Sequence, residues 1–254
     1  MRLNLVEAGE GAPLVLLHGL FGSAGNWGAI QKRLSATRRV LVLDLRNHGS
    51  SGRDAAMDYA AMAEDVAETL QALGAAPAAV LGHSMGGKVA MALALTRPRV
   101  VERLVVADIA PVTYPPALRS YVAAMQAVAL RPDLTRRDAD AALAEAVPEA
   151  GIRAFLLQNL RFGEGGPAWR LGLAEIAAAM PVIEGFPEFP GRYEGRVLVL
   201  AGERSGYIRP AHHERIRALF PSAEFATVPG AGHWVHAENP QGFLALVEPF
   251  LAEG

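Results

Sequence analysis

The chain has 254 residues, 51% of them hydrophobic, so it is long enough to bury the core of one large α/β domain. Its formal net charge of −2 leaves no basic excess to neutralise nucleic-acid phosphates, and the lack of cysteine excludes disulfides, thiol catalysis and thiolate metal sites. The sequence has neither a signal-peptide pattern nor an uninterrupted run of about 18 apolar residues, so we expect a cytoplasmic protein without nucleic-acid or membrane partners.

Short apolar runs that end in glycine or polar residues recur along the chain and predict strands. The runs cover residues 13–19, 39–49, 78–84, 103–111 and 196–205. Their apolarity is continuous rather than alternating, which is typical of parallel strands that are buried on both faces. A helix is predicted at residues 58–74, with Asp58 as its cap and Gly74 at its end. This alternation predicts a doubly wound α/β sheet that binds its ligand at the carboxyl ends of the strands.

The alternation stops between residues 111 and 195, where we expect only helical pieces. Thr135 can cap one of these helices, and residues 152–160 place apolar side chains on one face of another. We therefore predict a core domain made of residues 1–110 and 196–254. The helical cap, or lid, of residues 111–195 is inserted after the sixth strand, where it can exclude water.

The stretch "VLGHSMGGKVA", residues 80–90, fits two functional motifs. As G-x-S-x-G it predicts a nucleophile elbow, which exposes Ser84 in a tight strand-to-helix turn where Gly82 and Gly86 leave room for close backbone contact. As G-x-x-x-x-G-K it resembles a phosphate-binding loop, but Val89 stands where that loop needs a hydroxyl for its Mg²⁺. A third interpretation is a glycine-rich turn that only packs closely. With the nucleophile elbow, which the rest of the chain favours, we expect Lys88 to be an ordinary first-turn helix residue.

A serine on a nucleophile elbow needs a histidine base, and this base follows the elbow in the chain. His233, in the glycine-rich stretch "VPGAGHWVHAENP", is the best candidate because it follows the last strand-like run. We expect packing roles for His83 and His236. The adjacent His212 and His213 cannot share one helix face, so we expect them to be solvated rather than to bind a metal.

An acyl-transfer enzyme also needs two backbone N–H groups that stabilise an oxyanion. The loop "LLHGLFGS" offers the N–H of Leu20 or Phe21, and Met85 offers the N–H that follows the nucleophile. The nearby His18 is expected to anchor its loop. In "DLRNHGSSGR", residues 44–48 include charged and polar side chains that we expect to fix the loop backbone rather than to react.

With "LLHGLFGS", "DLRNHGSS", "GHSMGGK" and "GAGHWVHAENP" in this order, the sequence resembles the α/β-hydrolase superfamily over nearly its whole length. The resemblance is strongest to the small bacterial esterases of the YbfF type. It implies a mostly parallel eight-stranded sheet flanked by helices, and hydrolysis of esters or thioesters through an acyl-serine intermediate. It also implies that no cofactor or metal is needed, and it supports Ser84 as nucleophile and His233 as base.

The acid of the triad departs from the usual pattern of the superfamily. Its expected position, counted from Gly202 in the stretch "AGERSGY" past the seventh strand, is occupied by Ser205, which cannot balance the charge of a histidinium. Glu203 lies two residues early, whereas Asp108 follows an earlier strand from which an acid can reach the same histidine in this superfamily. We therefore predict Asp108 as the acid and Ser205 as an auxiliary hydrogen-bond partner, against the alternative that Asp108 only caps a strand-end turn.

The sequence therefore predicts a serine esterase that acts on small-molecule esters or thioesters of short to medium acyl chains. Aromatic residues near the site, Phe21, Tyr207 and Trp234, favour an uncharged or fatty acyl group. Acyl-CoA thioester cleavage, C–C bond hydrolysis and perhydrolysis would use the same residues and stay open as alternatives. A non-catalytic ligand-binding protein of the same fold is a further alternative, because the usual acid is missing.

Overall fold

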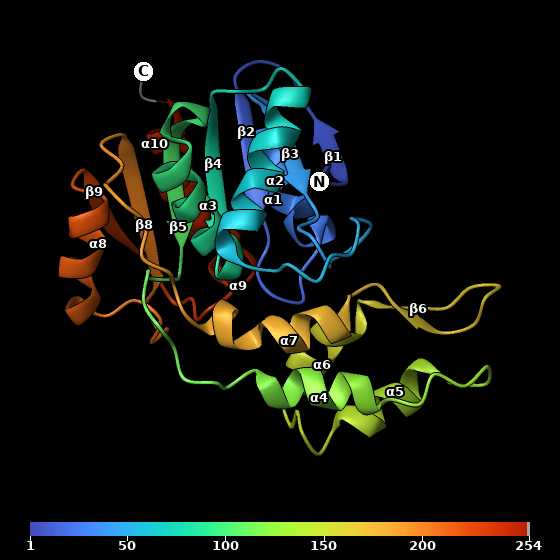
Figure 1. Ribbon diagram of the computed structural model, residues 1–254. Helices are drawn as coiled ribbons and strands as arrows, with labels where there is room; N and C mark the ends of the chain where they lie inside the picture. Colours follow the sequence, from blue (N-terminus) through green and yellow to red (C-terminus); the bar gives the residue numbers. More distant parts are fainter. Residues whose placement is uncertain (253–254) are drawn as a thin grey trace.

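The computed structural model, described for residues 1–252, contains a main sheet of seven strands (Figure 1). In spatial order these are β1 (Leu5–Ala8), β3 (Arg39–Leu43), β2 (Pro13–Leu17), β4 (Ala78–His83), β5 (Val101–Ala107), β8 (Arg196–Gly202) and β9 (Ala223–Val228). Only β1 runs antiparallel to its neighbour; the other pairs are parallel. The predicted mostly parallel α/β fold is confirmed.

The prediction of eight strands was wrong, since seven strands form the main sheet within residues 1–252. The chain before β1 adds no further strand, because the backbone N–H groups of Leu3 and Asn4 donate to the side chains of Thr69 and Ser51. β1 itself was missed in the sequence. It is an edge strand with half-exposed and exposed residues, and so it lacks the continuous apolarity that marks the other strands.

Both faces of the sheet are covered by helices, which explains that continuous apolarity. In β2, Val15 and Leu17 belong to one hydrophobic cluster and Leu14 and Leu16 to the other, and all four are fully buried. The first cluster packs under α2 (Tyr59–Ala72), α3 (Met85–Thr96) and α8 (His213–Leu219), the second under α1 (Gly28–Leu34) and α10 (Pro240–Ala252). In Figure 1, α3 lies in front of the sheet and α10 behind it.

The predicted helix at residues 58–74 is confirmed as α2. The Asp58 carboxylate accepts the N–H of Ala61 at 2.8 Å, an N-cap that contributes about 1 kcal/mol. Gly74 ends the helix with a φ of 60°, a left-handed conformation that favours glycine. Shorter pieces complete the core: η1 (Ala24–Trp27), η2 (Pro98–Val100), η3 (Pro210–His212) and α9 (Val235–Glu238).

Residues 111–195 form a mainly helical segment at the carboxyl end of the strands (Figure 1). Its helices are α4 (Arg119–Ala127), α5 (Arg136–Leu143), α6 (Ala150–Leu157) and α7 (Leu173–Glu184). The expectation that the segment has no strands was wrong, because β6 (Leu160–Arg161) and β7 (Ala168–Trp169) form a short hairpin. The segment follows β5, the fifth strand rather than the sixth, because the sheet has one strand fewer than expected.

Two details of this segment were predicted with different success. Thr135 caps α5 as expected and forms a capping box with Asp138. The helix expected at residues 152–160 ends earlier, at Leu157, and Leu160 lies in β6 while remaining buried. An apolar side chain in a two-residue strand can reach the same core as one in a helix, so the spacing alone did not mark the helix end.

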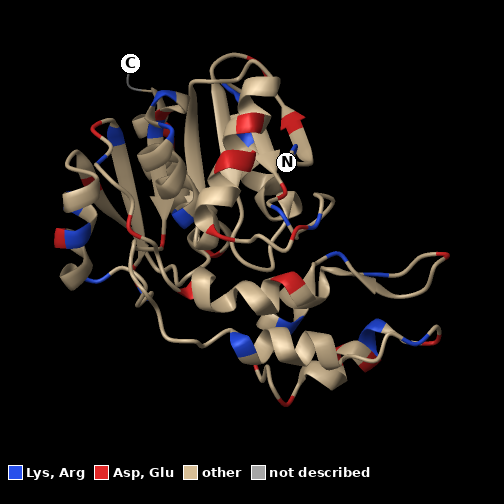
Figure 2. Ribbon diagram, viewed as in Figure 1, with Lys and Arg blue, Asp and Glu red and all other residues tan. Residues whose placement is uncertain are grey.

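Charged residues of both signs are interspersed over the molecule, in line with the formal net charge of −2 (Figure 2). The central strands β2 and β4 carry no charged side chain. Within residues 1–252, the helices are all too short or too polar to cross a membrane.

Candidate active site

Ser84 lies in a tight turn between β4 and α3. Its φ of 54° and ψ of −121° lie far from ordinary strand or helix values, a strain of about 1–3 kcal/mol for a residue with a side chain. A Cβ on Gly82 would lie 2.1 Å from the carbonyl oxygen of Gly86, and one on Gly86 would lie 2.4 Å from that of Leu17. This is the strand–turn–helix geometry of a nucleophile elbow, and the two glycines are required by close backbone contact.

The turn brings Ser84 within hydrogen-bond distance of His233. The Ser84 Oγ donates to His233 Nε2 at 3.0 Å, and His233 Nδ1 donates to the Asp108 Oδ2 at 2.7 Å. His233 comes from the loop between β9 and α9, and Asp108 follows β5 with a φ of 51°. Three residues that are distant in the sequence thus form a continuous Ser–His–Asp hydrogen-bond chain at the carboxyl edge of the sheet.

The Asp108 carboxylate is fully buried, and each of its oxygens has a hydrogen-bond donor. The N–H of Gly202 donates to Oδ1 at 2.9 Å, and the Ser205 hydroxyl donates to Oδ2 beside His233. Glu203 points elsewhere and accepts the N–H of Gly230 at 2.6 Å. The carboxylate that contacts the histidine is therefore Asp108, and the serine in the usual acid position contacts that carboxylate.

The loop after β2 lies directly beside Ser84. A Cβ on Gly19 would lie 3.2 Å from the Cβ of Ser84. Within residues 1–252, the backbone N–H groups of Leu20 and Met85 donate to no protein acceptor, so they are free to bind an oxyanion. The prediction that the Phe21 N–H could donate to the oxyanion was wrong, because this N–H donates to His48 Nε2 at 3.2 Å.

Buried polar side chains fix the loops after β2 and β3, as the sequence indicated. His18 Nδ1 donates to the Gly19 carbonyl at 2.8 Å, and its Nε2 accepts the N–H of Leu45 at 3.0 Å. Asp44 accepts the N–H of Ala24 at 2.7 Å. Burial lowers the pKa of His18, and it lowers the pKa of His48 to about 3. Neutral rings can both donate and accept, which these contacts require.

The remaining histidines have structural contacts. The buried His83 donates from Nε2 to the His233 carbonyl at 2.7 Å, and burial holds its pKa well below the usual range. The His236 ring stacks on the Trp27 ring, with 4.3 Å between the two ring centroids. Burial lowers the pKa of His236 to about 4. The expectation of solvated His212 and His213 was wrong, because both are half-buried: His213 stacks on Phe225, and His212 Nδ1 contacts the Tyr207 carbonyl.

Two of the predicted pocket residues contact the base itself. The Tyr207 ring stacks on the His233 ring, with 3.9 Å between the two ring centroids. The Trp234 ring is edge-on to the His233 ring, with 5.8 Å between their centroids. Trp234 also contacts Phe155 of α6 at 6.0 Å. Aromatic side chains of the core and of the inserted segment therefore enclose the base.

Two cavities meet at Ser84. The larger, of about 1050 Å³, is lined by His233, Trp234 and Phe21 from the core and by Ile152, Phe155 and Tyr121 from the inserted segment. The smaller, of about 60 Å³, is lined by Met85 and Lys88 on one side and by Leu118, Met180 and Ile183 of the segment on the other. The segment residues were missed in the sequence, because an apolar helix face can equally well pack against a core.

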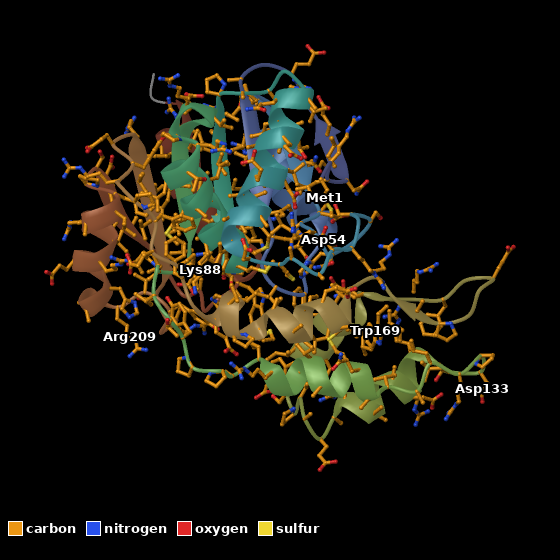
Figure 3. The ribbon with its side chains drawn as sticks, in the orientation of Figure 1. Met1, Asp54, Lys88, Asp133, Trp169 and Arg209 are labelled. Atoms are coloured by element: carbon orange, nitrogen blue, oxygen red, sulfur yellow. The ribbon has the colours of Figure 1, made fainter. Side chains whose placement is uncertain are left out.

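The expectation that Lys88 is an ordinary first-turn residue was wrong. Its side chain is fully buried, and Nζ donates to the carbonyl oxygens of Val112, Glu184 and Gly185 at 2.9, 3.1 and 2.6 Å. Figure 3 shows Lys88 where the core meets the inserted segment. Its ammonium is therefore directed away from solvent and occupied by backbone oxygens, so it cannot serve a phosphate-binding loop.

Within residues 1–252, no group of three or more metal-binding side chains comes together.

The chain itself is similar to known hydrolases. A family model described as "alpha/beta hydrolase fold" matches residues 12–240. The mouse sn-1-specific diacylglycerol lipase ABHD11 is 46% identical over 99% of this chain and 85% of its own length. The Escherichia coli K12 esterase YbfF is 37% identical over 94% and 93%. A solved structure described as a marine microorganism esterase superposes with a TM-score of 0.94, at 34% identity over 98% and 99%.

Proposed function

This chain belongs to the α/β-hydrolase family and is an ester hydrolase, and from that premise we propose that it cleaves esters of short to medium acyl chains through an acyl-Ser84 intermediate. The observation that carries the proposal is the hydrogen-bond chain from Ser84 Oγ through His233 to Asp108, with distances of 3.0 and 2.7 Å. A nucleophile, a base and an acid in this order are what acyl transfer requires.

In the first step, Ser84 Oγ attacks the acyl carbonyl carbon while its proton passes to His233 Nε2. The positive charge that forms on the ring is stabilised by the Asp108 carboxylate on Nδ1, which also fixes the tautomer. The N–H of Gly202 and the Ser205 hydroxyl keep that carboxylate in place. Ser205 thus acts through Asp108 and has a positioning role.

The carbonyl oxygen becomes an oxyanion in this step. We assign its two donors to the N–H groups of Leu20 and Met85, which flank Ser84 and have no protein acceptor within residues 1–252. One such donor typically contributes about 3–4 kcal/mol to lowering the barrier. The strained turn at Ser84 supports this role, since in a nucleophile elbow the N–H of the residue after the nucleophile belongs to the oxyanion hole.

The second step returns the enzyme to its starting state. His233 gives its proton to the leaving oxygen, the alcohol departs, and water takes its place beside Nε2. His233 then removes a proton from this water, which attacks the acyl carbon, and His233 returns the proton to Ser84 Oγ as the bond to the serine breaks and the acid leaves. The same residues therefore serve both halves of the reaction.

The lining of the larger cavity supports an uncharged oxygen ester over a CoA thioester. Its walls are mostly apolar, and the charged side chains among them are Glu149 and Glu238, of which Glu238 is paired with Arg204 at 3.3 Å. A CoA thioester carries several phosphate charges, which would meet the Glu149 carboxylate without a lysine or arginine in the lining. We therefore propose a neutral small-molecule substrate.

We also propose the cytoplasm as the location of the protein, as expected from the sequence.

Ester turnover together with mass spectrometry tests this proposal. We expect the purified protein to hydrolyse p-nitrophenyl butanoate, and we expect a peptide containing Ser84 to carry the acyl group in rapidly quenched samples. The Ser84→Ala variant should show neither, with an unchanged unfolding temperature as the control for folding. Turnover that survives in Ser84→Ala, or an adduct on another residue, would contradict the proposal.

A substrate panel separates the remaining alternatives. Butanoyl-CoA, a β-diketone and peroxide with acetate would report thioesterase, C–C hydrolase and perhydrolase activity on the same serine. Wild-type protein that turns over none of these esters or alternatives, but binds a small apolar ligand, would instead favour a non-catalytic binding protein.

A further inference from the structure

Lys88 is a buried amine whose pKa burial lowers to about 7, and the proposed reaction does not use it. It lies on α3, one turn after Ser84, and its side chain is only 1% exposed. Burying an ammonium costs free energy unless each of its N–H groups has an acceptor. The acceptors of Lys88 therefore indicate its role. Those acceptors lie at the start of the inserted segment and at the end of its last helix, α7.

The three closest acceptors of Lys88 Nζ are backbone oxygens from distant parts of the chain. Val112, at 2.9 Å, belongs to the strand-to-segment connection, while Glu184 and Gly185, at 3.1 and 2.6 Å, end α7. Three acceptors match the three N–H groups of an ammonium. One side chain of the core therefore holds the segment where it leaves the core and where it returns.

Two tyrosines lie beside the Lys88 ammonium and add contacts between the core and the inserted segment. The Tyr59 hydroxyl donates to the Ile183 carbonyl at 2.6 Å, and the Tyr114 N–H donates to the Glu184 carbonyl at 2.9 Å. The Lys88 ammonium lies 4.9 Å from the Tyr114 ring centroid and 5.7 Å from that of Tyr59, within the range of cation–π attraction.

The residues that this junction positions are walls of the substrate site. Leu118 follows Val112 and lines both cavities, and Met180 and Ile183 precede Glu184 and line the smaller one. The reacting residues Ser84, Asp108 and His233 all come from the core, and none of them accepts from Lys88 Nζ. A change at Lys88 can therefore move the walls while the reacting groups keep their places.

Other contacts hold the far part of the segment. Asn159 Nδ2 donates to the Phe21 carbonyl, and the N–H of Gly172 donates to the Asn47 carbonyl, both at 2.8 Å. The segment would thus stay attached without the ammonium. Its two ends, next to Ser84, would lose their common anchor.

We propose that Lys88 is a positioning residue whose ammonium fastens both ends of residues 111–195 to the core and so sets the substrate-binding walls beside Ser84. The inference rests on the proposed ester hydrolysis for its kinetic readout, but its structural readout is independent of any activity.

The Lys88→Met variant tests the proposal, because methionine keeps an apolar stem of similar length and removes the three donors. We expect KM for p-nitrophenyl octanoate to rise at least about tenfold, while kcat stays within about threefold, since wall contacts are lost and the reacting groups are not. In hydrogen exchange, amides near residues 112–118 and 180–186 should exchange faster, and those of β4 and β5 should be unchanged.

Two further variants keep the test decisive if Lys88→Met folds poorly. Tyr59→Phe removes only the hydroxyl that shares the same junction, and it should raise KM in the same direction by a smaller factor. In Lys88→Ala, propylamine should restore KM whereas propanol, which has the same length but no charge, should not. Restoration by both would indicate that Lys88 only fills space.

Other outcomes would overturn the inference. A loss of kcat at constant KM would place Lys88 with the reacting groups, and uniform faster exchange over the whole chain would make it a general stabilising residue. If the wild type hydrolyses no ester, the proposed function fails, whereas the exchange pattern still decides whether Lys88 fastens the segment.

Discussion

The carboxyl edge of the sheet and the inserted segment of residues 111–195 are built in different ways. Along the edge, the loops after β2 to β5 each contain a residue with left-handed φ that is not glycine: Phe21, Asn47, Ser84 and Asp108, in chain order. All seven histidines also lie outside the inserted segment, and most of them are buried. In the segment, by contrast, the residues with left-handed φ are glycines, Gly166 and Gly191.

This difference separates two tasks. Backbone strain persists only where the surroundings over-determine it, so the edge holds Ser84, Asp108 and the oxyanion donors rigidly. The segment contributes apolar walls such as Ile152 and Phe155 and joins the core through Lys88. Changes at the edge should therefore affect the reaction itself, and changes in the segment should affect substrate binding.

The largest expected effect is at the edge. Asp108→Asn keeps the size of the side chain but removes the charge that stabilises a histidinium, so we expect kcat to fall by about 10⁴-fold. Steady-state kinetics with p-nitrophenyl butanoate checks this. Ser205→Ala, which leaves the Asp108 carboxylate in place, should cost no more than about tenfold, since it removes one neutral donor. The reverse ranking would mean that Asp108 is not the acid.

Two glycine substitutions compare the stability of the regions. Gly82→Ala puts a Cβ 2.1 Å from the Gly86 carbonyl oxygen, so we expect it to lower the free energy of unfolding by more than about 3 kcal/mol. Gly151→Ala meets no atom within 4 Å and lies in α6, so it should raise that free energy by about 0.5–1 kcal/mol. Urea unfolding measures both. Equal effects would show that the edge is no more constrained than the segment.

Acid should destabilise the edge through its buried histidines. Burial lowers the folded-state pKa of His236 to about 4 and that of His48 to about 3, below the value of 6.5 that applies once they are exposed. As pH falls from 6.5 towards 4, the unfolded chain binds more protons, so stability decreases by up to about 1.4 kcal/mol per pH unit for each such ring.

Urea unfolding between pH 7 and pH 4 measures this decrease. His236→Gln should make the pH dependence shallower by the contribution of one ring, whatever its effect on stability at pH 7. An unchanged slope in that variant would show that His236 is protonated in the folded protein.

The smallest expected effect of a wall substitution on the kinetics is in the segment. Phe155→Ala removes a wall of the larger cavity that contacts Trp234, so we expect KM for an apolar ester to rise about tenfold at constant kcat. Kinetics with p-nitrophenyl octanoate and acetate check this, because the shorter ester should be less affected. A fall in kcat for both esters would show that the segment also orders the reacting groups.

The sequence predicted the parts of the fold that local patterns determine. The parallel strands were visible as continuous apolar runs because both faces of the sheet are covered. The edge strand β1 and the hairpin of β6 and β7 were not visible, since each is short and only partly apolar. The predicted number of eight strands came from the family resemblance and was one higher than the number in the main sheet.

For the candidate site, motifs predicted the residues that the structure brings together, but not their surroundings. Ser84 and His233 stand in recognisable loops, and the choice of Asp108 over Glu203 depended on the resemblance rather than on spacing. The occupied N–H of Phe21 and the contacts of Lys88 depend on pairs of residues far apart in the chain. Such pairs leave no local pattern, and so Lys88 was mistaken for an ordinary first-turn helix residue.

The division of tasks between edge and segment is tested most directly by the rate at which a small fluorophosphonate labels Ser84. This reagent needs the nucleophile, its base and the oxyanion donors, but few wall contacts. We expect Asp108→Asn to slow labelling by orders of magnitude and Phe155→Ala to leave it at the wild-type rate. Equal labelling rates in the two variants would contradict the division.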